Sequence, residues 1–225
     1  MIKAVFFDLD GVLIDSETTH QSMTEDFLRL TDLSIPPERF YLLIGSHKSL
    51  NPWAEVVRDI DLGGRTPEEV KEKLFAYKRE RLSHFDYSNI VFADVRPVLM
   101  QLRQAGLPIA CASSSRMEYI KKTLGDSGLL DLFDLAVTCD DFESSKPQPD
   151  IYLYCARYFG VSPAECLVVE DSPIGIAAGK NAGMTVAARI DHHFGMDQSR
   201  ADYFIEDLTA LPALIEHLSD VHPVC

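Results

Sequence analysis

Two aspartates near the start of the chain carry the clearest chemical signal in the sequence. Asp8 and Asp10 stand two residues apart, directly after an apolar run and just before Gly11. Side chains at this spacing point the same way from an extended chain. Two like charges held so close need a cation or a proton to offset their repulsion. An Asp-Gly turn after a strand would also explain these residues, because Asp is a common turn former.

A second acidic pair, Glu170-Asp171, follows another apolar run far along the chain. Several carboxylate oxygens near one point suit Mg²⁺, which prefers hard oxygen ligands and takes only a few of them from protein. The sequence Asp171-Ser172-Pro173 also has the pattern of a helix N-cap, and both interpretations can hold together. The two acidic pairs therefore predict a magnesium site, provided that the fold brings them together.

Two further segments have residue types that can hold phosphate. Ser113-Ser114-Ser115 lies between an apolar run and a helical pattern. There a hydroxyl and the N–H groups of a helix start can bind phosphate oxygens, although a plain helix cap is the alternative. Lys146 lies in the proline-stiffened segment 144–150. A lysine among carboxylates and phosphate would offset charge and orient a nucleophile; a solvated surface lysine is the alternative.

Short apolar runs alternate with helical patterns along most of the chain. The runs are unbroken, as is typical of strands that are covered on both faces. This alternation predicts a parallel sheet with right-handed crossovers. Ligands of such sheets bind beyond the carboxyl ends of the strands, where the polar segments above fall. The predicted strands are 2–7, 107–112, 135–138, 166–169, 184–188 and 203–205, and the predicted helices include 95–104, 117–124, 151–159 and 173–181.

Between the first two predicted strands lies a long stretch with helical patterns and no strand pattern. Turn signals interrupt it at 34–37 and 62–65, and Thr66-Pro67 followed by two glutamates is typical of a helix start. We predict that this stretch forms a small cap over the sheet. The α/β core would then consist of residues 1–15 and 86–225, and the cap of residues 16–85.

The composition restricts the classes of partner and the compartment. The formal net charge of −14 and sequence pI near 4.8 disfavour nucleic acid and anionic membranes, which need a surplus of Lys and Arg. Five cysteines, an odd number without CxxC spacing, predict small buried side chains in a reducing compartment.

The N-terminal apolar run is too short for a signal peptide, and no run is as long as a membrane helix. We expect a monomer in the cytoplasm.

Three further features predict structure rather than chemistry. Gly175 and Gly179 are expected to let a helix lie close to the sheet. Trp53 is expected to pack in the core of the helical stretch, although it could stack on a sugar. His192-His193 is expected to lie in a solvent loop, because no further ligand at suitable spacing supports a metal there.

Taken together, these segments resemble the haloacid dehalogenase (HAD) superfamily, in the subgroup of β-phosphoglucomutases and related sugar-phosphate phosphatases. The four segments appear in the order and at the spacing that this family uses, and the helical insertion lies where its helical caps lie. The resemblance implies a Rossmann-like parallel sheet core with an inserted α-helical cap domain. The matching segments are Asp8-Leu9-Asp10-Gly11-Val12 with Asp15-Ser16-Glu17, Ala112-Ser113-Ser114-Ser115-Arg116, Lys146-Pro147-Gln148-Pro149-Asp150 and Val169-Glu170-Asp171-Ser172.

The resemblance also implies roles for the residues. Asp8 would attack phosphorus and form an aspartyl phosphate. Asp10 would be the general acid for the leaving oxygen and then the base for water. Ser113 and Lys146 would hold the phosphoryl oxygens. Mg²⁺ would be held by the Asp8 carboxylate, the Asp10 backbone carbonyl and Asp171, with Glu170 as a nearby or direct ligand. The resemblance thus implies a metal ligand set of Asp8, Asp10, Glu170 and Asp171.

Substrate choice is expected to come from the cap and from the segment around Arg116. The mutases carry an Arg that grips the far phosphate where this chain has Lys48, and an Asn where it has Met117. Lys lacks the planar fork of Arg, so these departures favour a phosphatase of a small phosphomonoester, such as a sugar phosphate. A β-phosphoglucomutase-type mutase and a non-catalytic phosphate-ester binding protein are the alternatives. The predicted substrate-binding residues are His20, Lys48, Ser114, Ser115 and Arg116.

Overall fold

The structure is a computed structural model that describes residues 1–36, 39 and 53–221. The chain forms two compact units. The first, called the α/β unit below, consists of Met1–Asp15 and Tyr87–Cys225, and the second, called the helical unit, consists of Ser16–Asp86. The role of the helical unit as a cap stays a prediction. Within the described residues, every helix is too short or too polar to cross a membrane.

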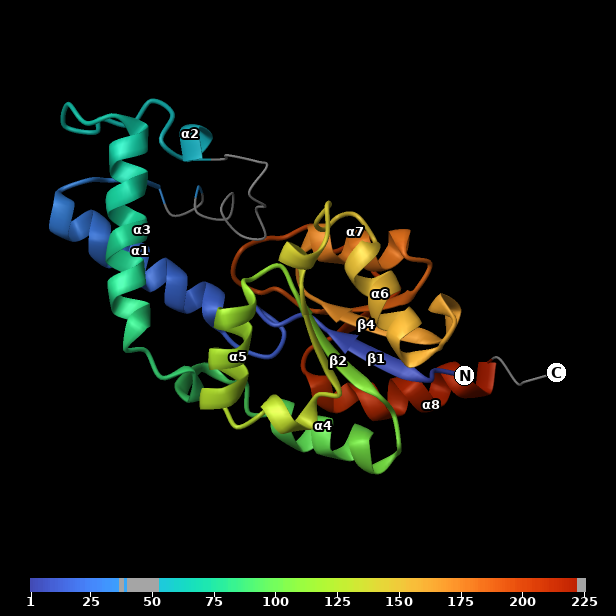
Figure 1. Cartoon of the computed structure of the whole chain (residues 1–225). Coiled ribbons are helices and arrows are strands. Elements are labelled where there is room, and N and C mark those ends of the chain that lie inside the picture. Colours follow the sequence, from blue (N-terminus) through green and yellow to red (C-terminus); the bar gives the residue numbers. More distant parts are fainter. Residues whose placement is uncertain (37–38, 40–52, 222–225) are drawn as a thin grey trace. The chain divides into compact units, whose positions relative to one another are not determined.

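A six-stranded parallel sheet forms the centre of the α/β unit, with strand order β3-β2-β1-β4-β5-β6 (Figure 1). Its two central strands, β1 and β4, are buried along their whole length, which explains why β1 is entirely apolar and β4 is apolar up to its last residue, Glu170. This confirms the predicted α/β fold class. The strands are β1 (Ala4–Phe7), β2 (Ile109–Ser113), β3 (Leu135–Thr138), β4 (Cys166–Glu170), β5 (Thr185–Arg189) and β6 (Tyr203–Ile205).

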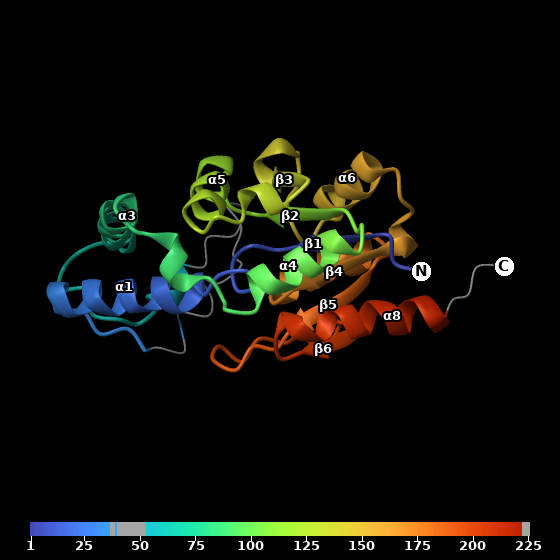
Figure 2. The same ribbon diagram turned by 90° about the horizontal axis from the view of Figure 1, so that it is seen from below.

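Helices cover both faces of this sheet. In Figure 1, α6 and α7 lie above the sheet, whereas α4 and α8 lie below it, and Figure 2 shows the latter pair from below. Phe6, Val168 and Tyr152 belong to the apolar cluster on the α6 side. The helices of this unit are α4 (Val95–Gln104), α5 (Met117–Asp126), α6 (Asp150–Phe159), α7 (Pro173–Asn181) and α8 (Leu211–Val221), with short 3-10 turns η2 (Tyr87–Ile90), η3 (Leu130–Leu132), η4 (Cys139–Asp141), η5 (Pro163–Glu165) and η6 (Leu208–Ala210).

The strand ends differ from the predicted ones where polar residues begin. β2 runs on to Ser113, which pairs with Thr138, and β4 runs on to Glu170, which pairs with Ala188. Ladder hydrogen bonds use the backbone, so a polar side chain does not end a strand. These two site residues therefore belong to the rigid sheet and not to the loops that follow it.

The helical unit contains α1 (Ser16–Thr31), α2 (Trp53–Val56) and α3 (Pro67–Ser83). α3 begins at a capping box, in which Thr66 and Glu69 each accept a hydrogen bond from the other's backbone N–H. Trp53 is 2% exposed within a separate apolar cluster and donates to the Pro67 carbonyl at 2.6 Å, which confirms its predicted place in a core.

The chain leaves the α/β unit after Asp15 and returns to it at Tyr87, and the segments at these two points pair with each other. Asp15 N–H donates to the Ile90 carbonyl at 2.8 Å, and Ile14 forms an antiparallel bridge with Val91. The helical unit is thus inserted between two segments that the α/β unit itself pairs.

Candidate active site

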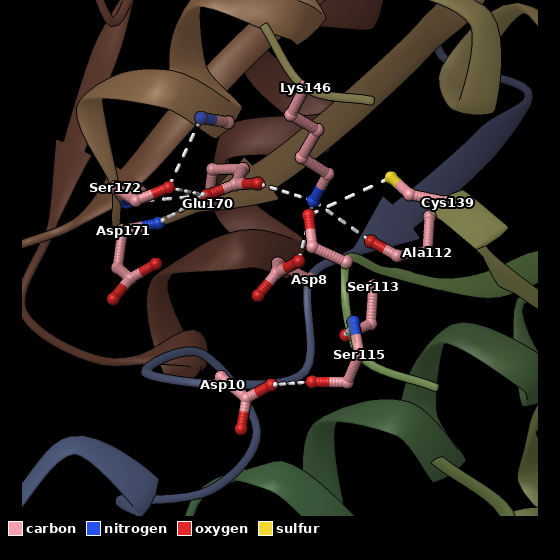
Figure 3. Close-up of polar contacts among 12 residues, drawn as sticks. Asp8, Asp10, Ala112, Ser113, Ser115, Cys139, Lys146, Glu170, Asp171 and Ser172 are labelled. Carbon is pink, nitrogen blue, oxygen red and sulfur yellow. Dashed lines mark hydrogen bonds and ion pairs between the residues drawn. The ribbon is translucent and has the colours of Figure 1, made fainter. Parts of the chain in front are cut away.

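Asp8 follows β1 and lies against a buried lysine. The Nζ of Lys146 lies 2.5 Å from Oδ1 of Asp8, 2.7 Å from Oε1 of Glu170 and 3.0 Å from the carbonyl oxygen of Ala112 (Figure 3). Lys146 is only 4% exposed. Because an ammonium group has three protons, these three acceptors use its full donor capacity and fix its direction. The alternative that Lys146 is a solvated surface residue is therefore wrong.

Charge in this cluster is unbalanced, with two buried carboxylates around one cation. Burial raises the pKa of Asp8 to about 7, with further contributions from the Glu170 and Asp10 charges, while Lys146 acts in the opposite direction. Although burial opposes its charge, the Asp8 and Glu170 carboxylates hold the pKa of Lys146 well above its ordinary value. The lysine thus stays charged, whereas the Asp8 carboxyl holds its proton to a higher pH than an ordinary aspartate does.

Glu170 has both carboxylate oxygens occupied by donors of the protein itself. Its Oε1 accepts from Lys146 and, at 2.9 Å, from the Tyr152 hydroxyl. Its Oε2 accepts from the backbone N–H of Asp171 and from the N–H and hydroxyl of Ser172, at 3.1 to 3.2 Å. Tyr152 also places its ring 4.9 Å from the Lys146 Nζ. Glu170 therefore anchors the cluster, because its hydrogen bonds tie α6, β4 and the start of α7 together.

The three carboxylates of the cluster could hold a metal ion. One oxygen each of Asp8, Glu170 and Asp171 lies within 4.8 Å of the others, and all three residues are buried. This set of hard oxygen donors suits Mg²⁺ better than a thiophilic metal. The predicted convergence of the two acidic pairs is thus observed for these three residues.

Two glycines make room for the carboxylates. Gly11 has a left-handed backbone with φ of 76°, and a Cβ there would overlap the Asp171 carboxylate. A Cβ at Gly175 would overlap the Glu170 carboxylate, and one at Gly179 would press on Val168 and Val186 of the sheet. The prediction that these glycines let α7 lie close to the sheet is confirmed for both, and at Gly175 the close approach is to the Glu170 carboxylate of β4.

Replacing Gly175 by Ala should displace the Glu170 carboxylate and disturb its contacts with Lys146. We expect a loss of about 1–3 kcal/mol of stability, as for an overpacked core, together with reduced turnover. Gly125→Ala is the matched control, since a Cβ at this helical position meets nothing within 4 Å and its φ is not positive. The comparison requires urea unfolding and turnover of both variants. Equal stability of the two would contradict the close packing at Glu170.

Asp10 lies beside the start of α5. Its Oδ2 accepts from the Ser115 hydroxyl at 2.9 Å and its Oδ1 accepts from the Tyr119 hydroxyl at 3.0 Å. Ser113 is buried and its hydroxyl accepts from the Ser115 N–H at 3.0 Å, in the turn that precedes α5. Figure 3 shows Asp8, Asp10, Ser113 and Lys146 gathered at the carboxyl ends of the strands, where they were predicted.

The other predicted substrate residues are spread more widely. Ser114 has its hydroxyl 3.7 Å from the Cys139 sulfur, and Arg116 is exposed at the N-cap of α5. His20 lies on α1 of the helical unit, and Lys48 lies outside the described residues. The roles of all these residues stay predictions.

Two tyrosines of the site were missed from the sequence. Tyr119 follows Ser115 by four residues, about one helical turn, and Tyr152 follows the lysine loop at the first turn of α6. Ser115 precedes the first residue of α5 and Lys146 precedes α6, so the spacing rule for side-chain pairs within a helix would not have found either tyrosine. The loop with His192 and His193 is exposed, as expected, and His192 pairs there with Glu206.

Comparison with known proteins agrees with this arrangement. A model of the family "Hydrolase: haloacid dehalogenase-like hydrolase" matches residues 2–183. YhcW of Bacillus subtilis (strain 168) is 35% identical over 184 residues, covering 82% of this chain and 81% of that protein. Hexitol phosphatase B of Escherichia coli (strain K12) is 29% identical over 192 residues, covering 81% of each chain.

A solved structure extends the likeness to the fold. β-Phosphoglucomutase (pgmB) from Clostridium difficile has a TM-score of 0.75 at 21% sequence identity, covering 98% of this chain and 99% of that one. An identity this low supports the fold and not the activity. From the family match and the 35% identical relative, the chain belongs to the haloacid dehalogenase-like hydrolases.

Proposed function

We propose that this enzyme is a Mg²⁺-dependent phosphatase that hydrolyses a small phosphomonoester through an aspartyl phosphate on Asp8. The observation that carries the proposal is the buried carboxylate of Asp8, held 2.5 Å from the Lys146 ammonium at the end of a central strand. A nucleophile must be held in a fixed direction and shielded from bulk water. The contact with Lys146 supplies the direction, and the burial of Asp8 supplies the shielding.

The reaction would proceed in two balanced steps. An Asp8 oxygen forms a bond to phosphorus while the ester P–O bond breaks, and Asp10 gives a proton to the departing alcohol oxygen. Water then attacks the aspartyl phosphate, Asp10 takes its proton, and inorganic phosphate leaves with the Asp8 carboxylate restored. Lys146 and Ser113, both buried beside Asp8, would stabilise the phosphoryl oxygens.

The carboxylates that would hold Mg²⁺ are those of Asp8 and Asp171, joined by the backbone carbonyl of Asp10. Glu170 would stand behind them, because five protein donors already occupy its oxygens. When bound, the ion would neutralise charge between the Asp8 carboxylate and the phosphate, two anions that otherwise repel each other.

The substrate we propose is a sugar phosphate or similar small metabolite. Support comes from a relative that is named for its action on such a compound, hexitol phosphatase B. His20, Lys48, Ser114, Ser115 and Arg116 would contact the part of the substrate beyond the phosphate. Lys48 and Met117 stand where mutases have Arg and Asn, so the grip on a second phosphate would be weaker and water would reach the intermediate.

The test is to follow both products from β-glucose 1-phosphate with a trace of its bisphosphate. Mg²⁺-dependent release of phosphate with little glucose 6-phosphate is expected, here or with a better sugar phosphate found by screening. Glucose 6-phosphate formed much faster than phosphate would overturn the phosphatase proposal in favour of a mutase. Chelation should abolish turnover and Mg²⁺ should restore it; full activity of metal-stripped enzyme would contradict the proposed metal site.

A further inference from the structure

The carboxylate of Asp10 is held at both of its oxygens by hydroxyl groups from one short segment. Ser115 donates to Oδ2 at 2.9 Å and Tyr119 donates to Oδ1 at 3.0 Å. Two contacts on the two oxygens fix both the position and the plane of the carboxylate, whereas either one alone would leave it free to rotate. Ser115 is itself tied down, because its carbonyl accepts from the Thr138 hydroxyl at 2.7 Å.

Tyr119 has a ring that is fixed by its surroundings. It packs edge-to-face on Tyr87, with centroids 5.2 Å apart and planes at 85°. Tyr87 is buried and carries the Lys122 ammonium 5.0 Å from its ring centroid. The hydroxyl of Tyr119 reaches Asp10 while its ring contacts Tyr87, so this aromatic pair lies beside Asp10. A hydroxyl on such a ring loses little further freedom when it binds a carboxylate.

We propose that Tyr119 is a positioning residue for Asp10, and that it aims the Asp10 carboxylate for both proton transfers of the reaction. This inference rests on the proposed function, in which Asp10 is the general acid and base. Each carboxylate oxygen has two lone pairs, and each hydroxyl uses only one of them. The two hydroxyls thus orient Asp10 and leave a site on either oxygen for the proton that it carries to the leaving alcohol or takes from water.

Tyr119→Phe removes one hydroxyl and keeps the ring that packs on Tyr87. Acetyl phosphate is a suitable probe, because its acetate leaving group needs no proton. Phosphorylation of Asp8 should then stay within about twofold, whereas dephosphorylation by water, which needs Asp10, should slow about tenfold. Phosphate release should fall while the phosphorylated fraction of enzyme, measured by intact mass after acid quench, rises. A purely structural defect would lower both quantities.

A double-mutant cycle decides whether Tyr119 acts through Asp10. In an Asp10→Asn background, Tyr119→Phe should cause no further change in phosphate release. Tyr154→Phe is the control, since Tyr154 is 39% exposed on α6 and packs on Phe142. An equal effect of Tyr119→Phe in both backgrounds, or none in the wild type, would overturn this inference. If Asp10→Asn itself leaves phosphate release unchanged, the assignment of Asp10 in the proposed function fails instead.

Discussion

Replacing Asp8 by Asn is expected to lower turnover more than about hundredfold while leaving the fold intact. The amide keeps the shape of the side chain but cannot attack phosphorus, so no aspartyl phosphate can form. Phosphate release and intact mass after acid quench measure the two consequences. Retention of more than about a hundredth of wild-type turnover in well-folded protein would contradict the covalent role of Asp8.

The stability of the same variant is the control, and it has a defined pH dependence in metal-free protein. Burial raises the pKa of Asp8 from its ordinary value of 3.8 to about 7. The folded state therefore binds this proton more tightly than the unfolded state, and its stability falls as pH rises from about 4 to about 7. Asp8→Asn removes this loss. With chelator present, the variant should match the wild type near pH 4 and exceed its stability near pH 8.

Replacing Lys146 by Met should have the opposite effect on stability. Removing Asp8 leaves one cation with one carboxylate, whereas removing Lys146 leaves Asp8 and Glu170 buried without their cation. Breaking a buried ion pair from one side typically costs about 3–5 kcal/mol. Turnover should also fall about 10²–10³-fold, because the preorganised positive charge beside Asp8 and the phosphoryl oxygens is lost.

Urea unfolding in the presence of chelator measures this difference, with Lys180→Met as the matched control. Lys180 pairs with Asp202 at 2.5 Å, but both side chains are about a third exposed. Such surface pairs contribute about 0–1 kcal/mol. Similar losses in the two variants would show that the Lys146 cluster is solvated, which would contradict its burial and the charge balance proposed for Asp8.

The fold could be predicted from the sequence because buried parallel strands appear in it as short, continuous apolar runs. Runs such as Cys166–Val169 have no polar position, and each is followed by the polar residues that a strand end exposes to a ligand. Asp8 and Lys146 are far apart in sequence, yet their placement followed from the rule that parallel strands end at a common edge. Position at the edge was therefore predictable from topology alone.

The contacts that orient the site were not predictable in this way. Tyr119 and Tyr152 lie inside helices, where an aromatic residue usually signals packing, and only side-chain geometry shows that their hydroxyls reach Asp10 and Glu170. The role of Gly175 likewise depends on how closely α7 approaches the Glu170 carboxylate. Differences of a few tenths of an ångström in position decide which groups form a hydrogen bond, and hydrophobic periodicity does not encode them.

The pairing of Asp15 with Ile90 and of Ile14 with Val91 bears on how such an enzyme can change over evolutionary time. The segments on either side of the insertion pair with each other inside the α/β unit. The sheet and the site at its edge therefore do not depend on the inserted residues to bring these segments together. Closing a longer or shorter insertion alters the free energy of folding only slowly, with the logarithm of its length. Lineages could therefore exchange the whole inserted module while inheriting the sheet and the residues at its edge unchanged.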